Sequence, residues 1–200
     1  MDSMKLVLAS GSPRRLQLLA SLGLDCEVSP LYIDETPRPG EAPVHYARRI
    51  AAEKAAAAVA RHAPDRLVLA ADTVVALDDE ILGKPAGHDE AARMLRRLSG
   101  RCHEVHTAVA ACREGTTAFR LSSSEVTFRK LLEHEVEAYV ATGEPLDKAG
   151  AYGIQGLAAV FVARLCGSYS GVVGLPLCET AELLGGFGLD VFAGRAGARP

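Results

Sequence analysis

A carboxylate in the middle of an apolar run is the feature of this sequence that points most directly to chemistry. Asp72 lies within residues 67–75, among leucine, alanine and valine. Burying a carboxylate costs free energy unless it pairs with a cation. Catalytic carboxylates occur where a buried strand emerges into a cleft. Asp72 is therefore a candidate catalytic residue; the alternative is a structural ion pair with an arginine or lysine.

Two adjacent arginines follow a turn of small residues. Ser12 and Pro13 are typical of the N-cap and first position of a helix, and Arg14 and Arg15 come next. Arginines there add positive charge where the helix dipole is already positive. Backbone N–H groups at a helix start bind anions, and arginine binds phosphate well. The pattern predicts a phosphate site; the alternative is that both arginines point into water.

Two lysines and a glycine-rich segment are weaker signals. Lys54 ends the apolar face of an expected helix over 44–62, where its stem could simply extend to solvent. Lys84 lies in a stiff turn before Pro85, or is an exposed loop residue. Glycines within 147–156 allow a backbone to approach a ligand closely, but their spacing is neither that of a P-loop nor that of a dinucleotide-binding fingerprint.

Composition excludes some classes of function. The 200 residues are 48% hydrophobic and 24% charged, which is typical of a globular enzyme. The net charge of -3, the absence of Trp and an aromatic content of 5% argue against a nucleic-acid-binding protein, although the arginine pairs 14–15, 48–49 and 96–97 keep that alternative open. We expect neither a signal peptide nor a membrane span.

The five cysteines are an odd number without a C-x-x-C pair, which predicts reduced thiols in the cytoplasm. Cys102, His103 and His106 are close in sequence and could be metal ligands. They lie in an alternating stretch, however, where neighbouring side chains point to opposite faces. We therefore favour structural roles for all three.

Helix-like and strand-like segments alternate, which predicts an α/β protein with a mixed twisted sheet flanked by helices. We expect helices over 12–22, 44–62, 89–98, 133–141 and 177–184, and strands over 5–9, 66–77, 103–113, 117–129 and 158–165. Turn residues lie at 78–79 and 114–115. Without repeats or low-complexity linkers, we expect one domain over 1–200, with a core over about 5–186 and a loose tail over 193–200.

Taken together, these pieces resemble the Maf family of nucleotide pyrophosphatases. The matching segments occur in the family's order, at residues 8–15, 34–35, 52–55, 71–75, 83–85, 98–100, 148–156 and 167–176. Residues 149–156, with the sequence AGAYGIQG, resemble the branch that prefers dTTP and UTP. Two departures are Gly171, where the family has Asn, and His106, where it has an aromatic residue.

The resemblance implies two lobes around a deep cleft, a homodimer, and a divalent metal, Mg²⁺ or Mn²⁺. It implies that Asp72 accepts the proton of the attacking water, and Asp72 and Glu35 are the carboxylates available to the metal. Base catalysis and metal ligation compete for one carboxylate, and the sequence does not divide these roles between the two residues. The catalytic set it implies is Asp72, Glu35, Lys54 and Lys84. The substrate-binding set it implies is Ser10, Arg14, Arg15, Thr73 and Gln155.

The expected activity is hydrolysis of dTTP and UTP to the monophosphate and pyrophosphate, which removes unwanted nucleotides. The Gln155 amide can donate to a pyrimidine O4 and accept from N3–H, a pairing that suits uracil and thymine but not cytosine. Alternatively, Gln155 only bonds the backbone of its own loop. The alternatives for the whole chain are a 7-methyl-GTP pyrophosphatase and a nucleotide-binding regulator of cell division without catalysis.

Overall fold

The structure, a computed structural model, describes residues 5–193 and is built on one mixed seven-stranded sheet. The strand order is β2-β1-β3-β5-β6-β7, and β4 pairs with part of β3. The strands are β1 (Leu6–Leu8), β2 (Cys26–Val28), β3 (Leu67–Leu77), β4 (Glu80–Leu82), β5 (Cys102–Arg113), β6 (Thr116–Phe128) and β7 (Val162–Cys166). Strand β1 is parallel to both β2 and β3, and the other pairs are antiparallel.

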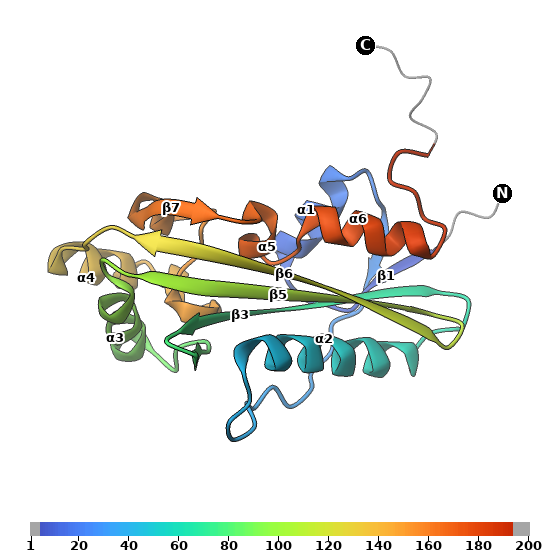
Figure 1. The fold of residues 1–200 in the computed structure, drawn as a ribbon, viewed down its shortest axis with the longest axis horizontal. Coiled ribbons are helices and arrows are strands. Elements are labelled where there is room, and N and C mark those ends of the chain that lie inside the picture. Colours follow the sequence, from blue (N-terminus) through green and yellow to red (C-terminus); the bar gives the residue numbers. More distant parts are fainter. Residues whose placement is uncertain (1–4, 194–200) are drawn as a thin grey trace, which may run out of the picture.

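Helices cover both faces of this sheet, as Figure 1 shows. Helix α2 lies on one face, and α1, α5 and α6 lie on the other, while α3 and α4 gather at one end. The helices are α1 (Pro13–Ser21), α2 (Pro43–Val59), α3 (His88–Leu98), α4 (Glu133–Ala141), α5 (Tyr169–Val173) and α6 (Leu177–Gly186). Three 3-10 turns, η1 (Glu144–Asp147), η2 (Ala149–Ala151) and η3 (Leu157–Phe161), follow α4.

The alternation of side chains along β3 divides the core into layers. Val68, Ala70 and Val74 belong to the cluster packed against α2, whereas Leu67 and Leu69 belong to the cluster on the opposite face. Both sets are almost fully buried, because helices cover the sheet on each side. Asp72 has the same parity as Val68 and Ala70, so its side chain points toward α2.

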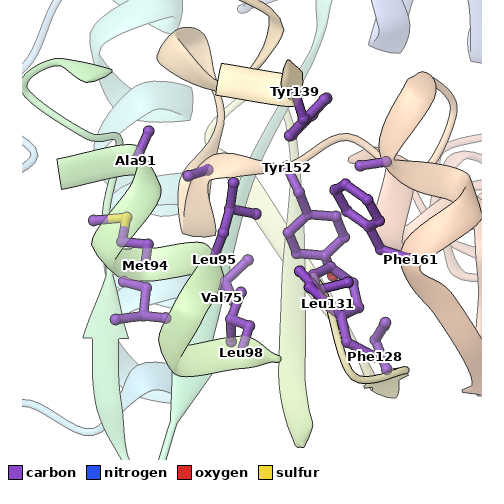
Figure 2. Close-up of a cluster of buried hydrophobic side chains, with 14 of the residues drawn as sticks. Val75, Ala91, Met94, Leu95, Leu98, Phe128, Leu131, Tyr139, Tyr152 and Phe161 are labelled. Atoms are coloured by element: carbon purple, nitrogen blue, oxygen red, sulfur yellow. The ribbon is translucent and has the colours of Figure 1, made fainter. Parts of the chain in front are cut away.

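A third cluster fills the end of the molecule where α3 and α4 meet the sheet (Figure 2). Aromatic rings from distant segments meet there edge to face: Phe128 lies 4.8 Å from Tyr152, and Tyr139 lies 5.3 Å from Phe161, between ring centroids. Edge-to-face pairs add to the stabilisation that burial provides. This cluster includes buried side chains of the glycine-rich segment that follows α4.

The predicted helices and strands are confirmed except at residues 158–165. Residues 158–165 do not form a single strand: η3 occupies the first part and β7 begins at Val162. Ala158 and Phe161 are buried and Val160 is exposed, and this three-residue spacing suits a helical turn. A short apolar run in a sequence does not by itself distinguish a strand from a helical segment. The short elements β2, β4, α5, η1 and η2 were not predicted. Both hairpin turns are confirmed: the residues at 78–79 and 114–115 have positive φ.

In the described part of the chain, no helix has both the length and the apolar character that crossing a bilayer requires. None of the five cysteines forms a disulfide. Of the expected loose tail over 193–200, all but Ala193 lies outside the described residues.

Candidate active site

A gap in the strand pairing of β3 places the central carboxylate at an open edge of the sheet. On this edge, β1 pairs with residues 67–69 and β4 pairs with residues 75–77. Between them, no described strand pairs with Asp72 and Thr73 on this edge, whereas β5 pairs with both residues on the other edge. The gap lies beyond the carboxyl end of β1, where the chain turns into α1. Ligands of open α/β sheets commonly bind at such a position, because neighbouring connections leave in opposite directions there.

A pocket of about 870 Å³ lies over this gap. Its walls come from the turn between β1 and α1, the loop before α2, helix α2, strand β3, the segment after β4, the glycine-rich segment and α5. All the residues that the sequence proposed for the site line it: Ser10, Arg14, Arg15, Glu35, Lys54, Asp72, Thr73, Lys84 and Gln155. The structure thus brings together residues that are up to 145 positions apart, from 10 to 155. The two-lobed shape stays a prediction.

Lys54 forms ion pairs with two carboxylates in this pocket. Its Nζ lies 2.7 Å from Oδ1 of Asp72 and 2.8 Å from Oε1 of Glu35. Lys54 and Asp72 are only 8% and 5% exposed, whereas Glu35 is partly open to solvent. Tyr46 Oη donates to the backbone carbonyl of Glu35 and fixes the loop against α2. Lys54 is therefore no surface lysine with a buried stem, because its ammonium group itself is buried between the acids.

The environment of Asp72 makes its carboxylate more basic than usual. Burial raises the pKa of Asp72 above its ordinary value, and the positive charges of Lys54 and Arg15 oppose that rise. The neighbouring carboxylate of Glu35 raises the pKa further. A carboxylate with a raised pKa that still has cationic neighbours is suited to accept a proton in the pH range of the cell.

Arg15 is held rigidly on the other side of the gap. Its Nε donates to the carbonyl of Gly174 at 2.8 Å, and its terminal nitrogens donate to Ser10 Oγ and Thr73 Oγ1, both at 3.2 Å. Thr107 Oγ1 lies 2.9 Å from Thr73 Oγ1 and 2.8 Å from the carbonyl of Gly171. The Gly171 carbonyl can only accept, so the single hydroxyl hydrogen of Thr107 is donated to Gly171. The Thr73 hydroxyl therefore donates to Thr107.

These contacts leave part of the Arg15 fork available to a ligand. A guanidinium has five N–H donors, and three are used here, which leaves one on each terminal nitrogen. Burial lowers the pKa of Arg15, while Asp72 and Glu35 oppose that change. Arginine stays protonated in proteins, so Arg15 presents a fixed positive charge and two free N–H donors, which can bind phosphate oxygens.

The other predicted ligand-binding residues lie at the rim. Arg14 is paired loosely with Asp147, its NH1 lying 3.6 Å from Oδ2. Lys84 and Gln155 are exposed to the pocket, and within residues 5–193 neither side chain has a hydrogen bond or an ion pair. Gln155 thus does not bond the backbone of its own loop, which leaves its amide available to a ligand.

The donor set fits a hard divalent cation shared with a substrate. Asp72 Oδ2 and Glu35 Oε2 have no hydrogen-bond partner in the described part of the chain. Mg²⁺ commonly binds one or two carboxylates and completes its shell with water and substrate phosphate oxygens. Residues 5–193 hold no cluster of three or more His, Cys, Asp or Glu that could bind a metal without a substrate.

Sequence reasoning missed several residues of this site. Thr107 and Tyr46 bond to predicted site residues, and Glu144, Asp147 and Lys148 line the pocket. A signal for Thr107 existed, since a hydroxyl in an apolar strand needs a partner. The partners themselves depend on strand register and could not be read from the sequence.

The Cys102, His103 and His106 side chains do not converge on a common site. Cys102 is exposed, and the two histidines are buried on opposite faces of β5. His103 Nε2 lies 2.8 Å from Tyr152 Oη, and His106 Nδ1 lies 2.8 Å from Ser123 Oγ. Both histidines thus have structural partners.

Gly171, one of the departures from the family pattern, lies in α5 in close contact with two serines. A Cβ there would lie 3.1 Å from Ser168 Cβ and 3.3 Å from Ser122 Oγ. A larger side chain would therefore need these neighbours to move.

Comparison with known proteins shows the family of this chain. The family model described as Maf-like protein matches residues 5–187. A dTTP/UTP pyrophosphatase of Methylococcus capsulatus is 52% identical over 199 residues, which cover 100% of this chain and 98% of that protein. A dTTP/UTP pyrophosphatase of Escherichia coli O157:H7 is 53% identical over 182 residues, which cover 91% and 92%.

A solved nucleoside-triphosphatase / dITP/XTP pyrophosphatase of Mycobacterium abscessus is similar over 64% of this chain and 76% of that one, with 21% identity and a TM-score of 0.42. The family match covers nearly all the described residues, including every predicted site residue. The chain belongs to the Maf family.

Proposed function

We propose that this protein hydrolyses dTTP and UTP to the nucleoside monophosphate and pyrophosphate. The observation that carries this proposal is the pocket in which a basic carboxylate, Asp72, faces a rigid arginine, Arg15. Relatives that are 50–54% identical over most of the chain are named dTTP/UTP pyrophosphatases. The expected role is to remove unwanted nucleotides, modified pyrimidine nucleotides included.

The charges of the pocket suit a triphosphate, which carries close to four negative charges. Arg15 binds phosphate oxygens through its two free donors, and Arg14 and Lys84 add positive charge at the rim. Ser10 and Thr73 hold Arg15 in place, so little ordering is required when substrate binds. The phosphate chain therefore lies across the gap in β3, next to Asp72.

Asp72 accepts a proton from the water that attacks the α-phosphorus. The new bond forms between the water oxygen and phosphorus, the bond to the bridging oxygen breaks, and pyrophosphate leaves with that electron pair. Lys54 keeps Asp72 ionised and balances the negative charge of Glu35. Removing a positioned base of this kind typically lowers the rate by about 10²–10⁴-fold.

A divalent cation, Mg²⁺ or Mn²⁺, would be held by Asp72 and Glu35 through their free oxygens. When bound, it neutralises phosphate charge and lowers the pKa of a coordinated water. Removal of the cation with a chelator should abolish turnover, and addition of Mg²⁺ should restore it.

In this proposal, the Gln155 side chain recognises the base of the substrate. Its free amide can donate to O4 and accept from N3–H of uracil or thymine, while cytosine has the opposite polarity at both positions. Gln155→Ala should therefore reduce the preference for UTP over CTP. If that preference stayed unchanged, Gln155 would not read the base.

The decisive test incubates the purified protein with Mg²⁺ and UTP, dTTP, CTP, GTP or 7-methyl-GTP and separates the products by anion exchange. We expect monophosphate and pyrophosphate from UTP and dTTP, and a rate with Asp72→Asn that is lower by about 10²–10⁴-fold. Orthophosphate and diphosphate would show cleavage at the terminal bond. Turnover of 7-methyl-GTP alone would assign the other branch, and binding without turnover would favour the regulator of cell division.

The remaining expectations are part of the same proposal. One domain spans the chain, which is supported by a family match over residues 5–187. The unpaired cysteines support a cytoplasmic location. A homodimer rests on the family resemblance, and sedimentation at several concentrations tests it. We propose no nucleic-acid partner; salt-dependent binding of an oligonucleotide would contradict this.

A further inference from the structure

The turn that carries Gln155 is bonded at both of its ends to one pair of side chains. Gly156 N–H donates to the carbonyl of Gly153 at 3.0 Å and closes a four-residue turn with Gln155 at its third position. At the start of the turn, Gly153 N–H donates to Tyr139 Oη at 3.3 Å. Just after it, Leu157 N–H donates to Glu144 Oε2 at 3.2 Å.

Tyr139 and Glu144 are bonded to each other. Tyr139 Oη donates to Glu144 Oε1 at 2.9 Å, so both ends of the turn lead to one connected pair. Tyr139 is buried and packs edge to face on Phe161 (Figure 2), a contact that restricts movement of its ring. Lys148 Nζ donates to the carbonyl of Glu144, which fixes the backbone beneath the carboxylate. The support under the turn that carries Gln155 is therefore a connected set of hydrogen bonds.

The two glycines of the turn fit closely over this support. A Cβ at Gly156 would lie 2.0 Å from Glu144 Oε1, and a Cβ at Gly153 would lie 2.7 Å from Lys148 Cε. Real Cβ atoms do not approach so closely, so a side chain at Gly156 would displace the carboxylate. The absence of side chains allows the turn to lie directly on Glu144.

We propose that Tyr139 and Glu144 are positioning residues for base selection, which act by fixing the backbone of the turn from which the Gln155 side chain extends into the pocket. This inference rests on the proposed function. An amide discriminates uracil from cytosine only when its oxygen and nitrogen are held in register with the base edge. Neither residue bonds to Asp72, Lys54 or Arg15, so selection and hydrolysis are separable.

Three substitutions disturb the support in different ways. Tyr139→Phe keeps the ring and removes the hydroxyl that both Glu144 and Gly153 use. Glu144→Gln retains one acceptor oxygen where two donors must be satisfied. Gly156→Ala removes no hydrogen-bonding group and displaces the carboxylate by contact. Glu137→Gln, an exposed residue of α4, is the matched control.

The experiment measures kcat and KM for UTP and CTP with each variant and follows thermal unfolding. We expect the ratio of kcat/KM for UTP to that for CTP to fall by about 3- to 10-fold in each of the three variants, the loss typical of a hydrogen bond. The change should lie in KM for UTP, with kcat nearly unchanged. Glu137→Gln should leave the ratio as it is.

A double-mutant comparison separates positioning from general loosening. In the Gln155→Ala background, Tyr139→Phe should no longer change the ratio, because the group that it positions is absent. An unchanged ratio in the single variants with folded protein, or an equal effect in both backgrounds, would overturn the inference. If the unmodified protein hydrolysed neither UTP nor CTP, the proposed function itself would fail.

Discussion

The Nζ atom of Lys54 lies 2.7 Å from Oδ1 of Asp72, although the two residues belong to different elements and are both buried. Removing one partner of a buried pair leaves the other charge without compensation and is costly. Lys54 also reaches Glu35, so one ammonium group holds two carboxylates at the open edge of β3. This arrangement keeps a carboxylate with a raised pKa ionised where the substrate phosphates are expected.

Asn at position 72 should remove the proton acceptor while keeping the size of the side chain. We expect Asp72→Asn to lower kcat on UTP by about 10²–10⁴-fold, with a much smaller change in KM. Steady-state kinetics with quantification of pyrophosphate measures both values. Asp65→Asn, at an exposed position, is the control. A kcat near that of the unmodified protein would show that another group accepts the proton.

The pH profile should report the environment of Asp72. A base is active above its pKa, so kcat/KM should fall as the pH falls through the pKa of Asp72, which burial raises above 3.8. Lys54 lowers that pKa, so Lys54→Gln should move the acid limb to higher pH as well as reduce activity. Lys130→Gln, at an exposed position, should leave the limb in place. A shift to lower pH in Lys54→Gln would contradict the assignment.

Lysine should not replace Arg15. It keeps the charge but cannot donate to Gly174, Ser10 and Thr73 while presenting a fork to phosphate. We expect Arg15→Lys to raise KM for UTP by about 10- to 100-fold, the size expected for lost hydrogen bonds to charged groups. Arg48→Lys, which is exposed, controls for the substitution itself. Equal KM values for the two variants would mean that charge alone suffices.

The stability of the fold should depend on pH through His103. Burial lowers the pKa of His103 from 6.5 to about 4, so the folded protein keeps the ring neutral. The stability that the neutral His103 ring provides is fully present above pH 6.5, where the ring is neutral in both the folded and the unfolded chain. It is lost as the pH falls from 6.5 to about 4, because the unfolded chain binds a proton first.

This difference corresponds to about 3 kcal/mol in the free energy of unfolding. Denaturant unfolding at pH 7 and pH 4.5 measures it, and His103→Gln should show a smaller loss between the two. The exposed His88→Gln is the control. The same loss in His103→Gln as in the unmodified protein would assign the pH dependence to other groups.

The sequence by itself determined the local features of the site. An acid in an apolar strand, two arginines at a helix start and a glycine-rich turn are each visible over a few residues, because burial cost, helix capping and backbone freedom act locally. Asp72 and Arg15 are candidates on these local grounds, whereas Gln155 follows from the family resemblance; all three line one pocket. The order of the motifs sufficed for the family and the class of fold.

Only the tertiary structure decided how these residues are held. The gap between β1 and β4 depends on strand register, which a sequence specifies only through its long-range pairing. Residues from separate elements meet in three sets of contacts. These are the two ion pairs of Lys54, the series of hydrogen bonds from Arg15 to Thr107, and the hydrogen bond between Tyr139 and Glu144. Short sequence patterns do not predict such contacts, because each contact becomes favourable only when the whole sheet and its covering helices have packed.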